Sequence, residues 1–561
     1  MNARRLIAMT MLAAVVATAA GCGGGGAAPG GGGGGGSTKG GILRVGTTSY
    51  IDSLNPFVAI ESQSYNAFVM EYPQLVQYGP GEKLEGDWAT SWDEASDGLT
   101  WTFHLKPGGK WSDGKPLTAA DAAWTGNLIV KYQAGPTAAL AAALTHVTSM
   151  DAPNATTLVI HYDKPVANVL PQLEQFFILP QHVWSKYVGT NGKGLKSFRP
   201  EQSLPTVAGG PYSISQYQEK GTTVFKPNPS FYGPKSNAQA VAMTYYTNST
   251  SMIADLQAGN IDFADQVPYN AISSLQGDSS FVLDSVPSSE VTNITFNSNP
   301  LKPKNRELLN PQVREALEDA TDRDQIVKVI YAGHARPWAN MLSLQSGAFW
   351  LNPAIKPLPF DLAKANSILD SLGYKKGANG IRVVPATTGK YAQPAHPMVY
   401  NMMVPDSLDF NGDRQFQIIA DDWKQAGVKL NEQAGGDSSQ AYGIETAGKY
   451  TKFDLATWDW AEYVDPDAQL SYMTRAQWYS WSDTGYNSPL FNNQYLQQAT
   501  LINPKQRQAL VWKMEAEIAQ DRPYIELVDE DTVTANDKGW TNFYPDLNGY
   551  CKCYYTSPHR T

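Results

Sequence analysis

The densest group of side chains that could contact a ligand lies between Phe453 and Pro466. Residues 454–458 alternate as a strand, and residues 461–466 read as the loop that follows it. Carboxylates pair with ammonium groups, and flat aromatic rings provide contact area at a low entropy cost. Both types crowd this stretch and its end, at Trp458, Asp459, Trp460, Glu462, Tyr463, Asp465 and Asp467. We therefore predict ligand contacts here, above all from the two tryptophans, Glu462 and Tyr463.

The two tryptophans are two residues apart and therefore point to the same face of the strand. If one of them lines a cleft, we expect the other to line it as well, but the same face could instead pack into the core. Glu462 could likewise be a solvated acid of the loop. Trp481, at the end of residues 478–481, either covers the cleft or packs into the core.

Hydrolysis is the chemistry that competes with binding. A glycosidase needs two carboxylates at a set separation, and Asp459, Glu462 and Asp465 could supply them, although such acids are common in loops. The chain has neither a Gly-x-Ser-x-Gly nor a His-Glu-x-x-His motif, and its seven histidines lack ligand spacing. Ser112 and Lys115 have the spacing of a β-lactamase nucleophile, but the Asp-Gly between them predicts a turn. We expect a binding protein rather than an enzyme, with no cofactor and no metal site.

The chain begins with a segment typical of an export signal. Two arginines precede an apolar run, Leu6–Ala20, which is too short for a membrane-spanning helix. Small residues then lead to Cys22. This ending resembles the bacterial lipobox, in which the chain is cut before a cysteine that carries diacylglycerol, although Ala19 stands where lipoboxes usually have Leu. We predict a signal peptide over residues 1–21 and a lipidated Cys22, with an ordinary secretory signal and an incidental cysteine as the alternative.

Residues 22–41 are mostly glycine and offer no side chains that could pack. Such a chain has high backbone entropy and behaves as a flexible tether. A folded domain on this tether would stay near a membrane without entering it. We therefore expect an extracytoplasmic protein that is anchored to the cell membrane, at the cell surface or in the periplasm.

Composition limits the partners and the number of domains. The chain has 43 basic and 53 acidic residues, a net charge of −10, and this acidic balance argues against nucleic acid as a partner. The roughly 520 residues beyond the tether are too many for one core, so two or more lobes are expected. Besides Cys22 there are only Cys551 and Cys553. An exported pair could be oxidised, but a bridge across one residue is geometrically awkward, and the pairing stays open.

Strand and helix patterns mix along the rest of the chain. Alternation predicts strands at residues 41–48, 98–105, 157–162 and 291–297 and a hairpin of 213–217 with 222–226. Helical spacing predicts helices from residue 119 and at 311–331, 361–372, 415–426 and 504–520. Thr118 and Asp121 form a capping box, and Asp322 caps a second helix within 311–331. Because strands and helices do not alternate strictly, we expect α/β lobes with mixed sheets.

Several motifs, in order along the chain, are similar to those of a known family. They are residues 88–92 (WATSW), 97–105 (DGLTWTFHL), 111–117 (WSDGKPL), 209–212 (GGPY), 228–233 (NPSFYG) and 311–317 (PQVREAL). From about residue 41 to about residue 545, the chain resembles the extracellular solute-binding proteins of ATP-binding-cassette (ABC) importers, family 5. This group takes up oligopeptides, dipeptides and in some cases nickel or oligosaccharides.

The resemblance implies an α/β, two-lobed, periplasmic-binding-protein-like fold of class II, with mixed sheets, an extra inserted subdomain and a hinge with two crossings. The implied limits are residues 42–85, 205–290 and 527–561 for lobe 1, 86–204 for the inserted subdomain and 291–526 for lobe 2. The crossings would fall near residues 287–292 and 527–531.

The resemblance also implies a function. The chain would be a lipid-anchored, monomeric binding component that captures oligopeptides between its lobes and delivers them to the ABC permease subunits in the membrane. In peptide-binding relatives an Asp pairs with the peptide α-ammonium, and Glu462 stands in the matching place. An oligosaccharide or another non-peptide solute, such as a nickel chelate, is the alternative, and a secreted hydrolase is a distant one.

Further residues are expected at the cleft from their places near the first strand and the crossings. Ser49 and Tyr50 follow the first strand. Glu290 and Thr292 lie near a crossing, where polar backbone could bond an extended ligand in β fashion. Hinge structure alone could also explain these two residues.

Overall fold

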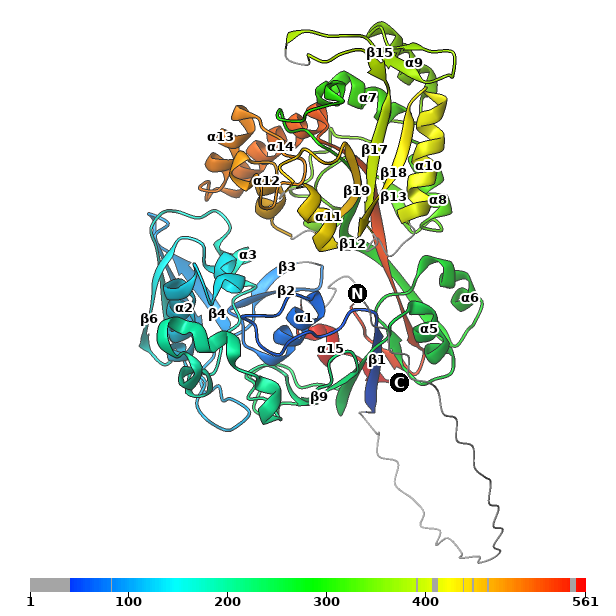
Figure 1. Cartoon of the computed structure of the whole chain (residues 1–561). Coiled ribbons are helices and arrows are strands. Elements are labelled where there is room, and N and C mark those ends of the chain that lie inside the picture. The colour runs from blue at the N-terminus through cyan, green and yellow to red at the C-terminus, as the bar shows by residue number, and fades with distance from the viewer. Residues whose placement is uncertain are drawn as a thin grey trace, which may run out of the picture. The chain divides into compact units, whose positions relative to one another are not determined.

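A mixed sheet of eleven strands runs through the described part of the computed structural model (Figure 1). The structure describes residues 41–561 except 82, 390–391, 406–411, 437, 446–447, 462–463 and 545–550. In sheet order the strands are β18 (Lys429–Gly436), β17 (Val399–Pro405), β19 (Leu455–Ala461), β12 (Phe281–Phe296), β20 (Tyr524–Asp537), β11 (Phe263–Ala264), β1 (Ile42–Thr47), β10 (Ala240–Tyr245), β9 (Thr222–Pro227) and β8 (Tyr212–Gln216), and β13 (Ala335–Pro337) pairs with β20.

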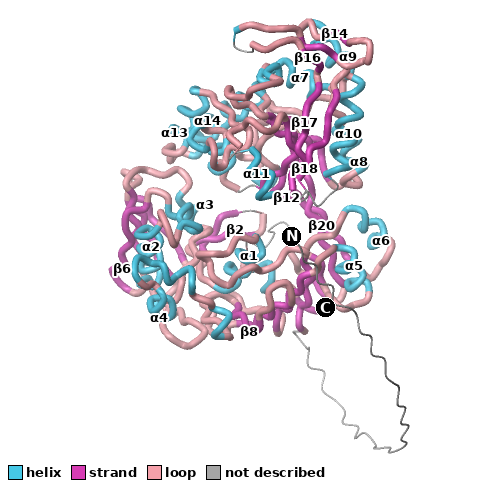
Figure 2. Tube along the Cα trace, viewed as in Figure 1, coloured by secondary structure: helices cyan, strands magenta, loops and turns pink. Residues whose placement is uncertain are grey.

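Strands β12 and β20 are long and run through both halves of this sheet (Figures 1 and 2). Their antiparallel pairing is regular from Phe281 to Pro287 and resumes at Val291. Between these stretches the three residues 288–290 stand opposite Glu530 alone, so β12 bulges there. Strand β19 joins β12 on one side of the bulge, and β11 joins β20 on the other. The bulge therefore separates one set of strands, β17–β19, from another, β1 and β8–β11.

The strands around β1 carry their own helices. These are α1 (Ser62–Glu71), α5 (Ser249–Gln257), α6 (Ile272–Gln276) and, near the C-terminus, α15 (Cys553–Thr556). Helix α5 contacts β1, and α1 contacts β8. A separate apolar core, which includes Leu43, Val45, Tyr212 and Phe225, lies along these strands.

A second sheet of four strands belongs to the residues between β1 and β8. Its order is β4 (Ala89–Glu94), β5 (Thr100–Leu105), β7 (Thr157–Tyr162) and β6 (Val147–Asn154). Helix α2 (Ala119–Tyr132) packs against β6 and begins at Thr118, whose capping box with Asp121 is confirmed. The same region holds β2 (Val76–Gly79), β3 (Lys83–Gly86), α3 (Val169–Leu173) and α4 (Gln181–Trp184).

The remaining helices lie with the strands β17–β19 (Figure 1). They are α7 (Pro311–Asp319), α8 (Arg323–Val329), α9 (Leu362–Ser371), α10 (Gly412–Gln425), α11 (Ser438–Glu445), α12 (Asp467–Tyr472), α13 (Pro489–Gln498) and α14 (Pro504–Asp521). The predicted second cap is confirmed, since the Asp322 carboxylate accepts from Gln325 N and starts α8. Asn503 caps α14 in the same way.

Short elements complete the described chain. The strands are β14 (Lys375–Lys376), β15 (Arg382–Val384), β16 (His396–Pro397), β21 (Trp540–Thr541) and β22 (His559–Arg560). The 3₁₀ helices span Ala138–Leu144, Ser185–Tyr187, Thr190–Ser197, Pro200–Ser203, Tyr269–Ala271, Arg306–Leu309, Leu344–Ser346 and Arg475–Gln477.

The described residues pack as one unit, and the lobe limits expected from the sequence remain a prediction. Within the described ranges, no helix combines the length and the apolar content that a membrane crossing needs. The predicted signal peptide, Cys22 and almost all of the tether lie outside the described residues.

Candidate functional site

A cavity of about 560 Å³ lies between two walls that come from distant parts of the chain. This volume falls in the range of small-molecule sites. The first wall comes from residues 78–175 and includes Asn168, Gln172 and Glu174. The second wall comes from residues 345–495 and includes Trp460, Asp465, Asp467, Tyr472 and Trp481.

The end of β19 and the short helix α12 build most of the second wall. Strand β19 carries Trp460 to the cavity, and the chain then passes through Asp465 into α12. Arg507, on α14, donates from both Nη atoms to the Asp465 carboxylate, at 2.5 and 2.7 Å. Gln498 Nε2 donates to Asp467 Oδ1 at 2.7 Å. Both carboxylates of this wall are therefore partnered by the protein itself.

Three aromatic rings of the second wall form a stack. Trp460 lies on Tyr472 with ring centroids 4.5 Å apart, and Tyr472 lies beside Trp481 at 6.2 Å. The Trp460 indole donates from Nε1 to Asp483 Oδ2 at 3.0 Å, and Tyr524 donates to the other oxygen of that carboxylate. Burial raises the pKa of Asp483 to about 6. This buried acid fixes the orientation of Trp460.

Glu174 gives the first wall a different kind of carboxylate. The residue is 4% exposed, it borders the cavity, and its carboxylate accepts no hydrogen bond from the described residues. Burial raises the pKa of Glu174 to about 7, against a smaller lowering effect of the Lys552 charge. This acid is therefore desolvated without a hydrogen-bond donor of its own.

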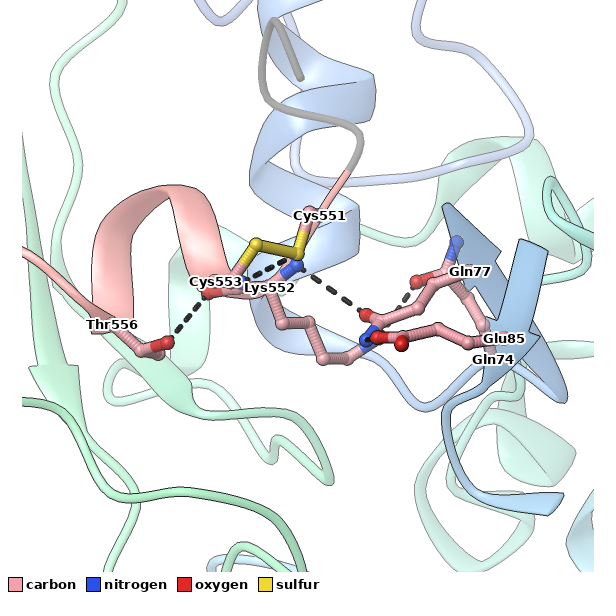
Figure 3. Close-up of a disulfide and its surroundings, with 7 residues drawn as sticks. All are labelled: Gln74, Gln77, Glu85, Cys551, Lys552, Cys553 and Thr556. Carbon is pink, nitrogen blue, oxygen red and sulfur yellow. Dashed lines mark hydrogen bonds between the residues drawn. A yellow bond between two sulfur atoms is a disulfide. The ribbon is translucent and has the colours of Figure 1, made fainter. Parts of the chain in front are cut away.

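Lys552 is held behind the first wall by other groups. Its ammonium donates to Gln74 Oε1 at 2.6 Å (Figure 3). It also lies 2.8 Å from an oxygen of Asp87. A disulfide joins Cys551 and Cys553 on either side of it, which answers the question that the sequence left open. The lysine is thus engaged by Asp87 and Gln74 and does not itself line the cavity.

Two hydrogen bonds join the walls at the edge of the cavity. Asn168 Nδ2 donates to Asp465 Oδ1 at 3.4 Å, and Ala167 N donates to Ala499 O at 3.0 Å. The two sides of the cavity are therefore in direct contact at these points.

The model of the family "Bacterial extracellular solute-binding proteins, family 5 Middle" matches residues 83–481. The chain belongs to this family. The expectation of a solute-binding protein rather than an enzyme is thereby confirmed, and so is the predicted family.

Relatives of this solute-binding protein agree in fold. A putative ABC transporter peptide-binding protein of Brucella ovis is 29% identical over 63% of this chain and 63% of its own length. The glutathione-binding protein GsiB of Escherichia coli is 25% identical over 89% of this chain and 91% of its own length. The periplasmic binding protein DppA of Helicobacter pylori, solved with the peptide STSA, has a TM-score of 0.72 at 21% identity over 92% of this chain and 98% of that one. The likeness to this solved structure confirms the predicted two-lobed α/β fold. The chain spans about 63% of the length of its Brucella relative.

The predicted ligand residues are only partly brought together in this solute-binding protein. Trp460 and Trp481 line the cavity, and Trp481 is 53% exposed, so it does not pack into the core. Trp458 does touch Trp460, at 6.1 Å between centroids, but it is 8% exposed and packs on Met403 and Ala456. Trp458 is therefore outside the lining of this cavity, in keeping with the core alternative, and its contact with a ligand stays a prediction.

Glu290, Thr292 and Tyr50 lie away from the cavity lining. Thr292 is paired on both sides, with Asp459 of β19 and Val528 of β20, so its backbone has no free edge. This pairing agrees with the alternative of a purely structural role, and contact of Thr292 with a ligand stays a prediction. Glu290 lies at the β12 bulge, where burial and then the Glu290 charge raise the pKa of Glu530.

Tyr50 packs on the strands of the first half of the chain. Its ring lies 5.5 Å from that of Tyr245, and the Lys220 ammonium lies 4.8 Å from its centroid. Glu462 and Tyr463 lie outside the described residues, and their contact with a ligand stays a prediction. Within the described ranges, no group of three or more His, Cys, Asp or Glu residues could hold a metal ion.

None of the first-wall residues is among those predicted from the sequence. Glu174 has one signal in the sequence: it stands alone next to an apolar run, residues 176–179, that is entirely buried. A charged residue beside such a run is unusual. Tyr472 and Asp483 have no comparable signal, since aromatic and acidic residues are common throughout the chain.

Proposed function

We propose that this chain captures an oligopeptide in the cavity between its two walls and, as a monomer, delivers it to the permease subunits of an ABC importer. The observation that carries the proposal is a cavity lined by residues 78–175 on one side and residues 345–495 on the other, in a chain of a solute-binding family. A ligand that touches both walls stabilises their closed arrangement over an open one. A peptide is the favoured ligand, because the Brucella relative is a putative peptide-binding protein and the Helicobacter protein was solved with the peptide STSA.

The direct test is to identify what the protein carries. Native mass spectrometry of freshly purified protein should show a bound mass that fragments as a peptide. Calorimetry with a panel of di- to pentapeptides should then give saturable binding, and small-angle scattering should show compaction on addition of the peptide that binds. Binding of none of these peptides, or turnover of any of them, would contradict the proposal.

Glu462 would pair with the α-ammonium of such a peptide. It follows Trp460 by two residues and so stands close, in the chain, to the aromatic stack. A charge-assisted pair is worth about 1.5–3 kcal/mol, so Glu462→Gln should weaken peptide binding about tenfold or more. Glu432→Gln, an exposed acid of β18, is the matched control. Equal affinities of the two variants would remove this role from Glu462.

The lipid anchor is part of the same proposal. Cleavage before Cys22 and lipidation of its thiol would hold the binding unit at the membrane by the glycine tether. Cys22→Ser should release the protein into the soluble fraction, whereas Cys551→Ser should not. A Cys22→Ser protein that still sediments with membranes would contradict the anchor.

A neutral oligosaccharide is the second candidate, and the stack of Trp460, Tyr472 and Trp481 is the observation that favours it. Flat rings bind the apolar faces of sugars as well as side chains. Calorimetry with neutral tri- and tetrasaccharides separates the two: saturable binding of sugar without binding of peptide would replace the first candidate by the second.

A further inference from the structure

The charges around the cavity are one-sided. The lining residues that the structure describes include Glu174, Asp465 and Asp467 and contain no Lys, Arg or His. A buried charge without a partner is costly, so a cavity with this lining disfavours any solute that buries a negative charge in it. It favours a solute that brings a positive charge.

The two carboxylates of the second wall cannot be the receptor of that charge. Asp465 already receives two hydrogen bonds from Arg507 and one from Asn168. Asp467 receives one from Gln498, and the Tyr495 hydroxyl lies 3.5 Å from it. Their charge is used within the protein.

Glu174 is in the opposite situation. It is nine-tenths buried, it borders the cavity, and no described group donates a hydrogen bond to its carboxylate. The nearby Lys552 is bound to Asp87 and Gln74, which limits what it offers to Glu174. A further donor to this carboxylate has to come from the cavity side, where a bound solute can supply it. The aromatic stack of the second wall lines the same cavity and also attracts cations through its ring faces.

We propose that Glu174 is a specificity-determining residue that receives an amine or guanidinium cation on the body of the solute, so that the cavity selects basic solutes. This proposal rests on the proposed function. Glu462 would hold the α-ammonium of the peptide, and Glu174 would receive a second positive charge of the same solute. For a peptide, the selected feature is a Lys or Arg side chain. The cavity then prefers basic peptides over neutral and acidic ones of equal length.

The experiment compares probes that differ in one charge. Calorimetry is run with Lys-Ala-Ala, Ala-Lys-Ala and Ala-Ala-Lys and with their three Gln counterparts, and cadaverine serves as a non-peptide cation. At least one Lys peptide should bind tenfold or more tightly than its Gln counterpart. Glu174→Gln should reduce that ratio to less than twofold, whereas Glu219→Gln, an exposed acid of the same half, should keep it.

The outcomes separate this proposal from the one before it. Peptides that bind with no preference for Lys overturn the role of Glu174 and leave peptide binding in place. Glu174-dependent binding of cadaverine without binding of any peptide supports the role of Glu174 and overturns the peptide proposal. Failure of every probe to bind overturns both. If the Glu174→Gln variant does not fold, the ratio of the affinities for the Lys peptide and its Gln counterpart, measured on the unchanged protein, still tests whether the cavity selects basic solutes.

Discussion

The two walls of the cavity use the same chemical group in opposite ways. On the second wall, Asp465 is clamped by Arg507, and Asp467 is bonded to Gln498. On the first wall, Glu174 is equally buried but receives no hydrogen bond from the described residues. The comparison teaches that burial alone does not mark a ligand-binding acid. What distinguishes Glu174 is that its carboxylate both borders the cavity and accepts no hydrogen bond from the described residues.

Removal of the partner on the second wall should produce the largest effect. Arg507→Met leaves the buried Asp465 carboxylate with two neutral donors, Asn168 Nδ2 and Asp467 N, and no cation, which should lower the free energy of unfolding by about 3–5 kcal/mol. Lys505→Met, on the exposed face of the same helix α14, is the control and should change it by less than about 0.5 kcal/mol. Urea unfolding followed by fluorescence measures both. If Arg507→Met lowers the free energy of unfolding by less than about 1 kcal/mol, the ion pair of Arg507 with Asp465 does not neutralise the second wall.

Replacement of the first-wall acid should have the opposite effect on stability, because Glu174→Gln should gain stability relative to the unchanged protein as the pH rises. The pKa of Glu174 is raised from 4.5 to about 7, so the folded protein keeps a proton that the unfolded chain releases. The free energy of unfolding should therefore fall as the pH rises from 4.5 to 7, by up to about 1.4 kcal/mol per pH unit from this group. Other buried acids add to the total slope, so the quantity to measure is the difference between the protein and Glu174→Gln. That difference should grow in favour of the variant across this window, with Glu219→Gln as control. A difference that does not change with pH would show that Glu174 ionises normally.

The pH dependence of binding is the next effect in size. If Glu174 receives a cation, ionisation of this acid strengthens binding, and its ionised fraction rises about tenfold between pH 6 and pH 8. The affinity for the best Lys peptide should rise by up to the same factor. Lys552, itself paired with Asp87, acts on Glu174 directly. Asp467 and Asp465, the latter paired with Arg507, line the opposite wall. The Gln counterpart of the peptide is the control, because its affinity should change less with pH. Equal changes in affinity for the two peptides would argue against the role of Glu174.

The smallest effect is expected at the exposed end of the aromatic stack. Trp481→Ala removes a ring that is 53% exposed, so stability should change by less than about 0.5 kcal/mol. Binding should weaken about two- to tenfold, because one ring face is lost from the cavity. Phe360→Ala, which removes an exposed ring outside the lining, should leave binding unchanged. Unchanged affinity in Trp481→Ala would place the solute away from this stack.

Local patterns predicted the elements well and the site less well. The capping box at Thr118, the cap at Asp322 and the alternation of β5 and β7 are all decided by residues close in sequence. The first half of β12 was missed, because Pro287 and the serines beside it read as a break rather than as a bulge. Trp460 could be proposed from its neighbours, whereas Glu174 and Tyr472 reach the cavity through packing between segments about 300 residues apart. Such contacts leave no periodic signal in one sequence.

The bulge in β12 also bears on how the two halves can turn against each other. Residues 288–290 face a single residue of β20, so β12 has slack where its partner is continuous. A rotation at this point can be absorbed by the backbone torsions of those few residues, while the hydrogen-bonded pairs before and after them stay intact. The elastic cost of such a rotation is then confined to one short stretch of chain. The rest of the sheet transmits the motion without having to re-form its pairing.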